Sequence, residues 1–331
     1  MTRWPPILAI VLMLGLPQFA GAEVKEDTSG IFTLEVENDL FGAGTDRHYT
    51  NGMRFSWISA ESTVPDWVRT GASYVPVFAI EGRKRLSYSL GQNMFTPDDI
   101  TRTDAQPDDR SYAGWLYAGV GLISDTGSHF DNLELNIGLI GPASLAEFTQ
   151  KGWHDAIGAT RPEGWSHQLK TEPGVVLFYE RKWRNRHEIT PRGLGIDLIP
   201  HAGFALGNVF TYGAAGVTMR FGDDLPNDYG PPRIRPSLPG SGYFIPDDRF
   251  GWYLFAGVEG RAVGRNIFLD GNTFADSHSV DKRHWVGDLQ FGAAVTLGRV
   301  RLAYTHVIRT EEFVSQENPD QFGSFSVSVR F

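Results

Sequence analysis

The chain has 331 residues, including 38 glycines and no cysteine; aromatic residues make up 13%, and the net charge is −9. The absence of cysteine excludes disulfides and thiol catalysis, and the acidic balance argues against a nucleic-acid partner. After residue 22 no apolar run reaches the about 18 residues that a membrane-spanning helix needs.

The first 22 residues have the pattern of a secretory signal peptide. Arg3 supplies the positive end, an apolar stretch covers residues 7–16, and Ala20-Gly21-Ala22 provides the small residues of a cleavage site. We therefore expect residues 1–22 to be removed and residues 23–331 to form the mature protein. An exported chain without disulfides needs a large core or a continuous hydrogen-bonded ladder, so a soluble β-sandwich and an outer-membrane β-barrel are both open at this point.

The last predicted strand discriminates between these two classes. Apolar and polar residues alternate strictly along it: Phe325, Val327, Val329 and Phe331 against Ser324, Ser326, Ser328 and Arg330. One apolar and one polar face is the lipid-out, lumen-in pattern of a membrane strand. Residues 23–331 are therefore predicted to form an all-β, transmembrane antiparallel β-barrel in the outer membrane of a Gram-negative bacterium.

Similar stretches recur along the chain and predict about twelve strands. They cover residues 32–37, 51–59, 84–95, 111–124, 130–140, 168–184, 187–206, 210–221, 251–265, 283–297, 299–308 and 321–331. Most reach the roughly 9–11 residues of a tilted membrane strand, and an even number places both termini on one side. We expect four tryptophans to lie in the interfacial girdles: Trp57, Trp115, Trp252 and Trp285.

With the N-terminus in the periplasm, the longer connections fall on the extracellular side. They are residues 40–50, 96–110, 141–167, 266–282 and 310–320. Tight periplasmic turns are predicted at residues 184–186 and 297–299. Two further periplasmic connections, residues 60–83 and 222–250, are longer than such barrels usually have, and we expect ordered caps or mobile loops there instead of a second domain.

One stretch, residues 141–165, does not read as a strand. Ser144 and Glu147 have the spacing of a capping box, and Gly158 followed by Pro162 provides a stop, so a short amphipathic helix is predicted between them. Its polar arc has His154 near the middle and Gln150 one turn earlier, opposite an apolar arc. The simpler interpretation of such a helix is a solvated face with a surface histidine.

Polar motifs at the ends of neighbouring hairpins are expected to converge with this helix at the extracellular rim. They are Asn38-Asp39, residues 46–52, Gln92-Asn93 and residues 96–102. The sequence lacks G-x-S-x-G, H-E-x-x-H and a G-x-G-x-x-G leading from strand to helix, so serine-elbow, zinc-protease and nucleotide chemistry have no support. A histidine beside carboxylates and amides suits ester hydrolysis, with histidine as general base and a hard cation such as Ca²⁺ held by aspartate.

Three motifs resemble the lipid A 3′-O-deacylase family of Gram-negative outer membranes. They are N-D-L-F…D-R-H-Y-T-N-G at 38–52, Q-N-M-F-T-P at 92–97, and G-P-A…Q-x-x-x-H-x-x-x-G…G-W-x-x-Q at 141–168. The resemblance implies a 12-stranded barrel whose active site lies between the barrel wall and a helix of an outer loop, facing the outer leaflet. The substrate would be lipid A or lipopolysaccharide among other outer-membrane lipids, and we expect a monomer.

The resemblance also implies roles for individual residues. His154 would activate a water that attacks the 3′ ester, while Asn38 and Asp39 would correspond to the calcium-linked pair that forms the oxyanion site. Thr50 and Gln150 match further active-site positions of the family.

One position departs from the family pattern, because a lysine important in the family is missing from the second outer loop. The nearest cation by spacing is Arg102, which could hold a phosphate or an oxyanion bidentately. Two alternatives stay open: a phospholipase-like hydrolase of another membrane lipid ester, and a non-enzymatic barrel such as a pore. The first would need a serine nucleophile beside histidine, and the second predicts that His154→Ala leaves every lipid unchanged.

Overall fold

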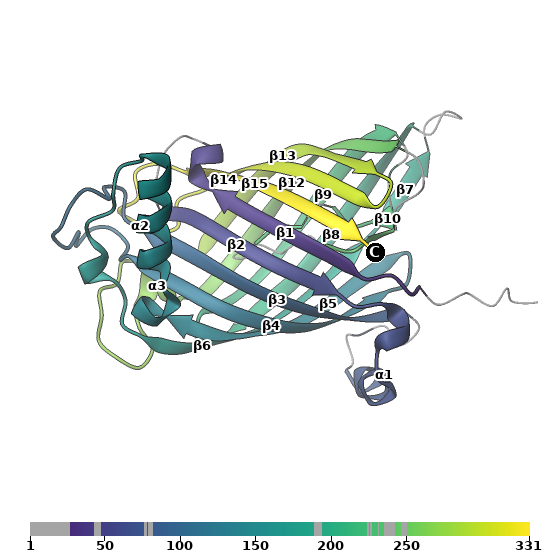
Figure 1. Cartoon of the computed structure of the whole chain (residues 1–331), viewed down its shortest axis with the longest axis horizontal. Coiled ribbons are helices and arrows are strands. Elements are labelled where there is room, and N and C mark those ends of the chain that lie inside the picture. The colour runs from purple at the N-terminus through teal and green to yellow at the C-terminus, as the bar shows by residue number, and fades with distance from the viewer. Residues whose placement is uncertain are drawn as a thin grey trace, which may run out of the picture.

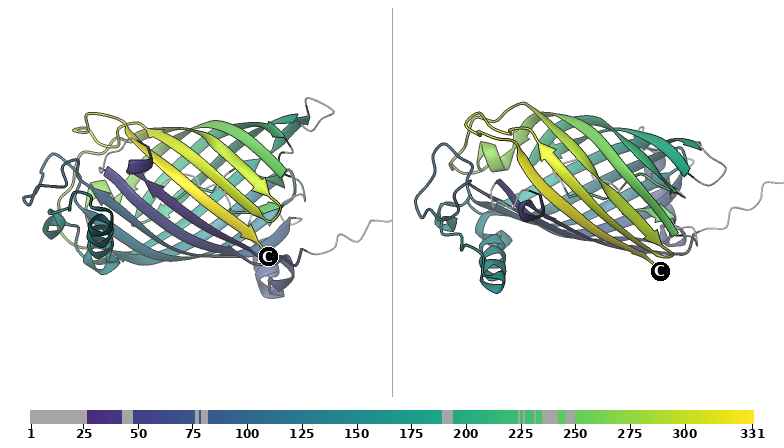
Figure 2. Two further views of the ribbon diagram at one scale, coloured as in Figure 1. Left: turned by 45° about the horizontal axis from the view of Figure 1, so that its top comes forward. Right: turned by 90° about the horizontal axis from the view of Figure 1, so that it is seen from above.

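The protein is a closed antiparallel β-barrel of twelve long strands (Figures 1 and 2). The computed structural model describes residues 27–42, 48–75, 78, 82–188, 194–223, 225, 227–230, 232–234, 242–245 and 250–331, so the predicted signal peptide lies outside the described residues. The strands are β1 (Ile31–Asn38), β2 (His48–Ile58), β3 (Arg83–Thr96), β4 (Ala113–Asp125), β5 (His129–Ile140), β6 (Glu172–Trp183), β8 (Leu194–Gly207), β9 (Phe210–Asp223), β12 (Phe250–Asn266), β13 (Trp285–Leu297), β14 (Val300–Arg309) and β15 (Asp320–Arg330). Antiparallel pairing of β1 with β15 and of β6 with β8 closes the ring and confirms the predicted fold.

The predicted alternation of the strands is confirmed on β15. Phe325 and Val327 are exposed on the outer wall, whereas Ser326 and Ser328 are buried on the luminal side. Among the described residues, no helix is both long and apolar enough to cross a membrane. Of the predicted girdle tryptophans, Trp57 and Trp285 are exposed.

The girdle prediction is wrong for Trp115, which is fully buried. Its ring stacks on Tyr117 with centroids 4.3 Å apart and meets Phe210 across the interior. Trp115 lies on the inward-facing row of β4. Hydrophobicity alone does not reveal which way an aromatic residue points, because aromatic residues occur on both sides of the wall.

Of the two predicted tight turns, only one is confirmed. Between β13 and β14 the chain reverses at Gly298, whose φ of 53° is in the left-handed region that glycine tolerates. At residues 184–186 the prediction is wrong, because the chain continues as β7 (Asn185–Glu188), paired with β8. Residues 189–193, which follow β7, lie outside the described part of the chain. Likewise β6 begins at Glu172, not at residue 168, because a 3₁₀ turn, η4 (Trp165–His167), precedes it.

The helix predicted in the third outer connection is present as α2 (Ala146–Ile157), but it begins differently from the prediction. The capping box is wrong: the Ser144 hydroxyl donates to the Gly141 carbonyl at 2.6 Å within η3 (Gly141–Ser144), and Leu145, with φ 59°, is the N-cap. The predicted stop is confirmed, since Gly158 has φ 69° and ends the helix.

The described part of the long connection at residues 60–83 covers part of the outer wall near the end where β1 begins and the C-terminus lies. It contains η2 (Glu61–Thr63) and α1 (Asp66–Ser73), and Ala72 and Phe78 pack with Tyr179 of β6. Trp67 on α1 and Tyr74, which follows the helix as its C-cap, are strongly exposed, as expected of anchors at a membrane interface. The predicted cap is thus present and lies against the outside of the barrel (Figure 1).

The second long connection, residues 222–250, folds back into the barrel lumen where it is described. Asp228 of β10 (Asn227–Asp228), which pairs with β11 (Phe244–Ile245), is fully buried and forms ion pairs with the inward-facing Arg220 and Arg301. The Ile234 N–H donates to the Glu37 carboxylate at 3.0 Å. This segment and the wall therefore share their polar groups inside the barrel.

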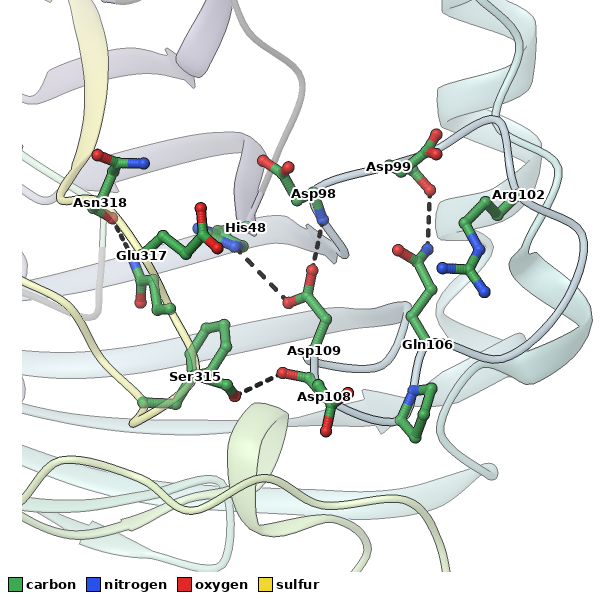
Figure 3. A pocket seen from close by; sticks show the side chains of 13 residues that line it. His48, Asp98, Asp99, Arg102, Gln106, Asp108, Asp109, Ser315, Glu317 and Asn318 are labelled. Atoms are coloured by element: carbon green, nitrogen blue, oxygen red, sulfur yellow. Dashed lines mark hydrogen bonds and ion pairs between the residues drawn. The ribbon is translucent and has the colours of Figure 1, made fainter.

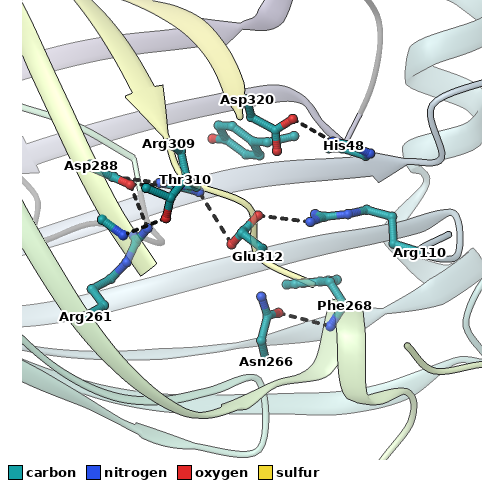
Figure 4. Close-up of polar contacts among 12 residues, drawn as sticks. His48, Arg110, Arg261, Asn266, Phe268, Asp288, Arg309, Thr310, Glu312 and Asp320 are labelled. Atoms are coloured by element: carbon teal, nitrogen blue, oxygen red, sulfur yellow. Dashed lines mark hydrogen bonds and ion pairs between the residues drawn. The ribbon is translucent and has the colours of Figure 1, made fainter. Parts of the chain in front are cut away.

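Further buried ion pairs fill the lumen towards the end of the barrel that carries α2 (Figure 4). Arg261 and Arg309 both donate to Asp288 at 2.9 Å, and Glu312 accepts from Arg110 at 2.9 Å while lying 3.8 Å from Arg309. Charges removed from water in this way are stable only when they are paired.

Asp228→Ala should destabilise the barrel by about 3–5 kcal/mol, because it leaves two buried guanidinium groups without their shared carboxylate. Urea unfolding in detergent micelles, followed by the electrophoretic mobility of folded and unfolded forms, measures the change. Asp104→Ala is the control, since it removes the partner of the exposed Arg102 and should leave the midpoint unchanged. Equal midpoints for both variants would contradict this account of the lumen.

Candidate functional site

The helix α2 lies on the outside of the barrel wall, over the extracellular ends of β3 and β4 (Figures 1 and 2). Gln92 donates to the Ser144 carbonyl at 2.6 Å, and Met94 packs in one cluster with Ala146. On β3 these two residues continue the outward-facing row of Tyr88 and Leu90, which are exposed. The helix therefore covers Gln92 and Met94 at one end of this row of β3, while Tyr88 and Leu90 in the same row face lipid.

Gln150 and His154 on the polar arc of α2 face the wall, contrary to the interpretation of a surface histidine. Gln150 is 3% exposed and His154 is 7% exposed, whereas Phe148 on the opposite arc is 80% exposed. The helix thus differs from a helix of a soluble protein, because its apolar side points outward while these two polar side chains are buried. This orientation places the histidine against the ends of the first strands.

A pocket of about 530 Å³ separates α2 from the rim of the barrel. Its walls come from the end of β1 and η1 (Asp39–Phe41), from the β3–β4 connection, and from the C-terminal half of α2 with the residues after it. Three of the predicted site residues line it together: Asn38, Asp39 and His154. The expected convergence of distant motifs is therefore present for these three.

The imidazole of His154 is held by the turn that follows α2. Its Nδ1 lies 2.5 Å from the Thr160 carbonyl oxygen, so Nδ1 carries the proton and donates it. The left-handed Gly158 makes this possible, because it reverses the chain directly after the helix and brings Thr160 back alongside. The remaining nitrogen, Nε2, is then the one with a lone pair that can accept a proton.

Asn38 and Asp39 are fixed by hydrogen bonds at the end of β1. The Asn38 amide donates to the Thr50 carbonyl at 2.9 Å, and its oxygen accepts the Leu40 N–H at 2.8 Å, which caps η1. The Asp39 carboxylate, almost fully buried, also accepts the Leu40 N–H, at 2.9 Å. Asn38 therefore positions the 3₁₀ turn that carries Asp39.

Thr50 and Gln150 do not line the pocket, although both are buried. The register of β2 against β3 shifts between Tyr49 and Asn51, which leaves Thr50 without a partner in that ladder, and its hydroxyl lies 2.7 Å from the Thr96 hydroxyl. Gln150 accepts a hydrogen bond from the Trp165 indole at 2.8 Å. Both predicted residues support the pocket from within the wall and the helix.

The pocket has an acidic character, and two of its carboxylates belong to the predicted polar motif at residues 96–102. Asp98 and Asp99 line it opposite Asp39, and none of the described lining residues is lysine or arginine. The Thr101 hydroxyl and backbone N–H donate to Asp99 and hold the pKa of its carboxyl below the usual range.

An acidic pocket of this kind attracts a cation, and Asp39 provides a buried carboxylate for it. No three His, Asp or Glu side chains among the described residues stand close enough to form a complete metal site, so backbone carbonyls or waters would supply the other ligands.

Arg102 does not line this pocket. Its guanidinium pairs with Asp104 at 2.5 Å, and it borders a second cavity of about 270 Å³, together with Asp99 and Gln106 (Figure 3). That cavity is also lined by His48, whose Nδ1 lies 2.6 Å from Asp320.

Asp46 and Arg47 of the first motif lie outside the described residues. No sequence signal pointed to the Thr160 carbonyl, because a backbone oxygen has no residue signature.

Residues 7–331 match the family model described as Outer membrane protein LpxR. Among solved structures, LpxR from Salmonella typhimurium has a TM-score of 0.75 and 21% sequence identity, covering 90% of this chain and 99% of that chain. The β domain of the Bordetella autotransporter BrkA reaches a TM-score of 0.44 at 11% identity, covering 92% and 99%. A comparison with curated protein sequences finds no match. The family model spans nearly the whole sequence, which confirms the resemblance seen in the motifs: the chain belongs to the LpxR family of outer-membrane proteins.

Proposed function

We propose that this protein is an outer-membrane lipid A deacylase that hydrolyses the 3′-O-linked acyl ester with a water activated by His154. The observation that carries the proposal is the orientation of His154, whose Nδ1 is bound to the Thr160 carbonyl while the ring borders a pocket shared with Asp39. Family membership supports lipid A as the substrate. The pocket is lined by α2, which lies outside the wall (Figure 1), and this position would give it access to the outer leaflet.

In this mechanism His154 acts as general base and then as general acid. Nε2 removes a proton from the water as its oxygen attacks the ester carbonyl, and the Nδ1–H donated to Thr160 supports the imidazolium that forms. When the tetrahedral intermediate collapses, the same proton passes to the departing sugar oxygen. The products are a free fatty acid and a sugar hydroxyl, and His154 returns to its neutral form.

A bound Ca²⁺ would stabilise the negative charge that develops on the carbonyl oxygen. Asp39 is the residue that would hold it, since its carboxylate is buried and fixed by the Leu40 N–H. Asn38 keeps η1 in place through the Thr50 carbonyl, while Asp98 and Asp99 maintain the negative potential of the pocket. Thr50 and Gln150 act as positioning residues.

The two alternatives receive less support. A serine hydrolase would need a serine beside His154, and no described lining residue of the pocket is serine; Ser144 is buried and bonded to Gly141. A pore would need an open lumen, but buried ion pairs and the folded-back segment around Asp228 occupy it.

His154→Ala should reduce deacylation by about a hundred- to ten-thousandfold, because it removes the general base. Mass spectrometry of lipid A from expressing cells should show the loss of one acyl group with the wild type and with the control variant, but not with His154→Ala. His284→Ala is the matched control, since this exposed histidine lies on the β12–β13 connection away from the pocket. Unchanged lipid A with the wild type would count against the proposal.

Asp39→Asn should weaken both hydrolysis and Ca²⁺ binding, because an amide is a poorer ligand than a carboxylate. Isothermal titration calorimetry of the folded protein gives a binding readout that is independent of activity. We expect chelation to abolish wild-type activity and added Ca²⁺ to restore it. Asp104→Asn, at an exposed carboxylate outside the pocket, should change neither. Activity that survives chelation would remove the cation from the mechanism.

Gly158→Ala should lower kcat by about five- to thirtyfold, because a side chain costs roughly 1–2 kcal/mol in the left-handed conformation and relief of this strain displaces Thr160 from His154. The KM should change little. Gly127→Ala introduces comparable strain in the β4–β5 hairpin, where φ is 86°, and should leave kcat unchanged. Equal kcat values for both variants would show that the turn does not orient His154.

A further inference from the structure

The surface of α2 divides into three sides of different chemistry. Towards the wall it buries Ala146, Gln150 and His154. A second side is charged, with Lys151 paired to Glu147 at 2.7 Å and Asp155 exposed beside them. The third side is apolar and exposed: Leu145 is 57%, Phe148 80%, Trp153 57% and Ile157 48% exposed.

Helices with one charged and one strongly apolar side lie in the plane of a membrane interface, with the apolar side in the acyl region. In all three views α2 crosses the long axis of the barrel instead of running along it, and it lies outside the wall at the extracellular end (Figures 1 and 2). A helix in this position runs along the membrane surface. Its charged side can then face the water while its apolar side faces the leaflet.

The wall of the barrel beneath α2 leads directly to lipid-facing residues. Ala146, on the wall side of α2, packs on Met94 of β3, and the same outward row of β3 continues through Gln92 to Leu90 and Tyr88, which are exposed. The exposed apolar side of α2 therefore lies beside the lipid-facing belt, and an apolar surface in that position has hydrocarbon as its natural partner.

Exposed apolar side chains also stand on both sides of the His154 pocket. Trp153 and Ile157 border it from α2, and Leu40, 55% exposed, borders it from η1. The polar lining, Asp39, Asp98 and Asp99, is contributed by the strand end and the loop. The pocket thus offers an apolar approach and a polar, acidic interior, the arrangement that an ester between a sugar and an acyl chain requires.

We propose that the apolar side of α2 is immersed in the acyl chains of the outer leaflet, and that Leu40, Trp153 and Ile157 form a lateral acyl-chain entrance to the pocket. The substrate then reaches His154 sideways, with its chains still in the leaflet and its sugar at the interface. The immersion of α2 stands independently, whereas the role of the entrance rests on the proposed deacylase function.

Because the chain has no cysteine, a single introduced cysteine carries a spin label without background. Phe148→Cys on the apolar side and Asp155→Cys on the charged side are labelled in protein reconstituted into phosphatidylcholine vesicles, each also carrying His154→Ala so that no catalysis is involved. We expect the label at position 148 to be relaxed by dissolved oxygen and shielded from a water-soluble nickel chelate. The label at position 155 should show the opposite. Equal access of the nickel chelate to both positions would overturn the immersion of α2.

The functional part is tested with Phe148→Glu and its conservative counterpart Phe148→Leu. Since the side chain is exposed, neither should change the unfolding midpoint in detergent. On lipid A embedded in vesicles we expect kcat/KM to fall at least tenfold for Phe148→Glu and to stay near the wild-type value for Phe148→Leu. A shielded label combined with unchanged kcat/KM for Phe148→Glu would show that the apolar side of α2 plays no part in hydrolysis, and would overturn the functional part of the proposal. If the wild type itself does not hydrolyse lipid A, the proposed function fails, and the labelling result alone decides the immersion.

Discussion

Closure of the hydrogen-bonded ladder is the constraint on which the rest of this structure depends. In hydrocarbon every backbone donor and acceptor must be paired within the protein, and the pairing of β1 with β15 leaves no open edge. Side chains alternate along a β-strand, and closure gives the sheet an inside and an outside, so each strand presents one row of side chains to lipid and one to the lumen. A polar site therefore cannot lie in the outer wall at membrane depth. It has to lie in the lumen or above the belt of exposed apolar residues.

In this protein the lumen is occupied, and the candidate site lies above the belt. Asp228 and its two arginines, with the chain of charges from Asp288 to Arg110, fill the interior with mutually paired groups. These pairs stabilise the barrel only while they remain complete, which leaves little freedom for a substrate. The site instead uses the outward face of the strand ends, where Asn38 and Asp39 emerge, and it needs a cover on that side.

The inverted helix α2 supplies this cover and explains why its amphipathic pattern is misleading. In a soluble protein the apolar side would be buried, and His154 would be a surface residue. Beside a membrane the surroundings are apolar on one side and aqueous on another, so the helix buries Gln150 and His154 against the wall and exposes Phe148. The same arrangement brings the histidine to the pocket and the hydrophobic residues to the lipid.

The sequence by itself determined the barrel, its twelve strands, the outer helix with its stop at Gly158, and the grouping of Asn38, Asp39 and His154, because period-two alternation, glycine chemistry and family motifs are local signals. Tertiary structure alone decided the rest. The luminal position of the described part of residues 222–250 depends on charges from distant strands, and the burial of Trp115 depends on which face of β4 points inward. The start of α2 follows from the η3 turn, where Ser144 bonds to Gly141 instead of capping the helix. Arg102 pairs with Asp104 away from the pocket, and the partner of His154 is a backbone carbonyl. Each of these outcomes depends on which surfaces meet in space, a property that no short stretch of sequence encodes.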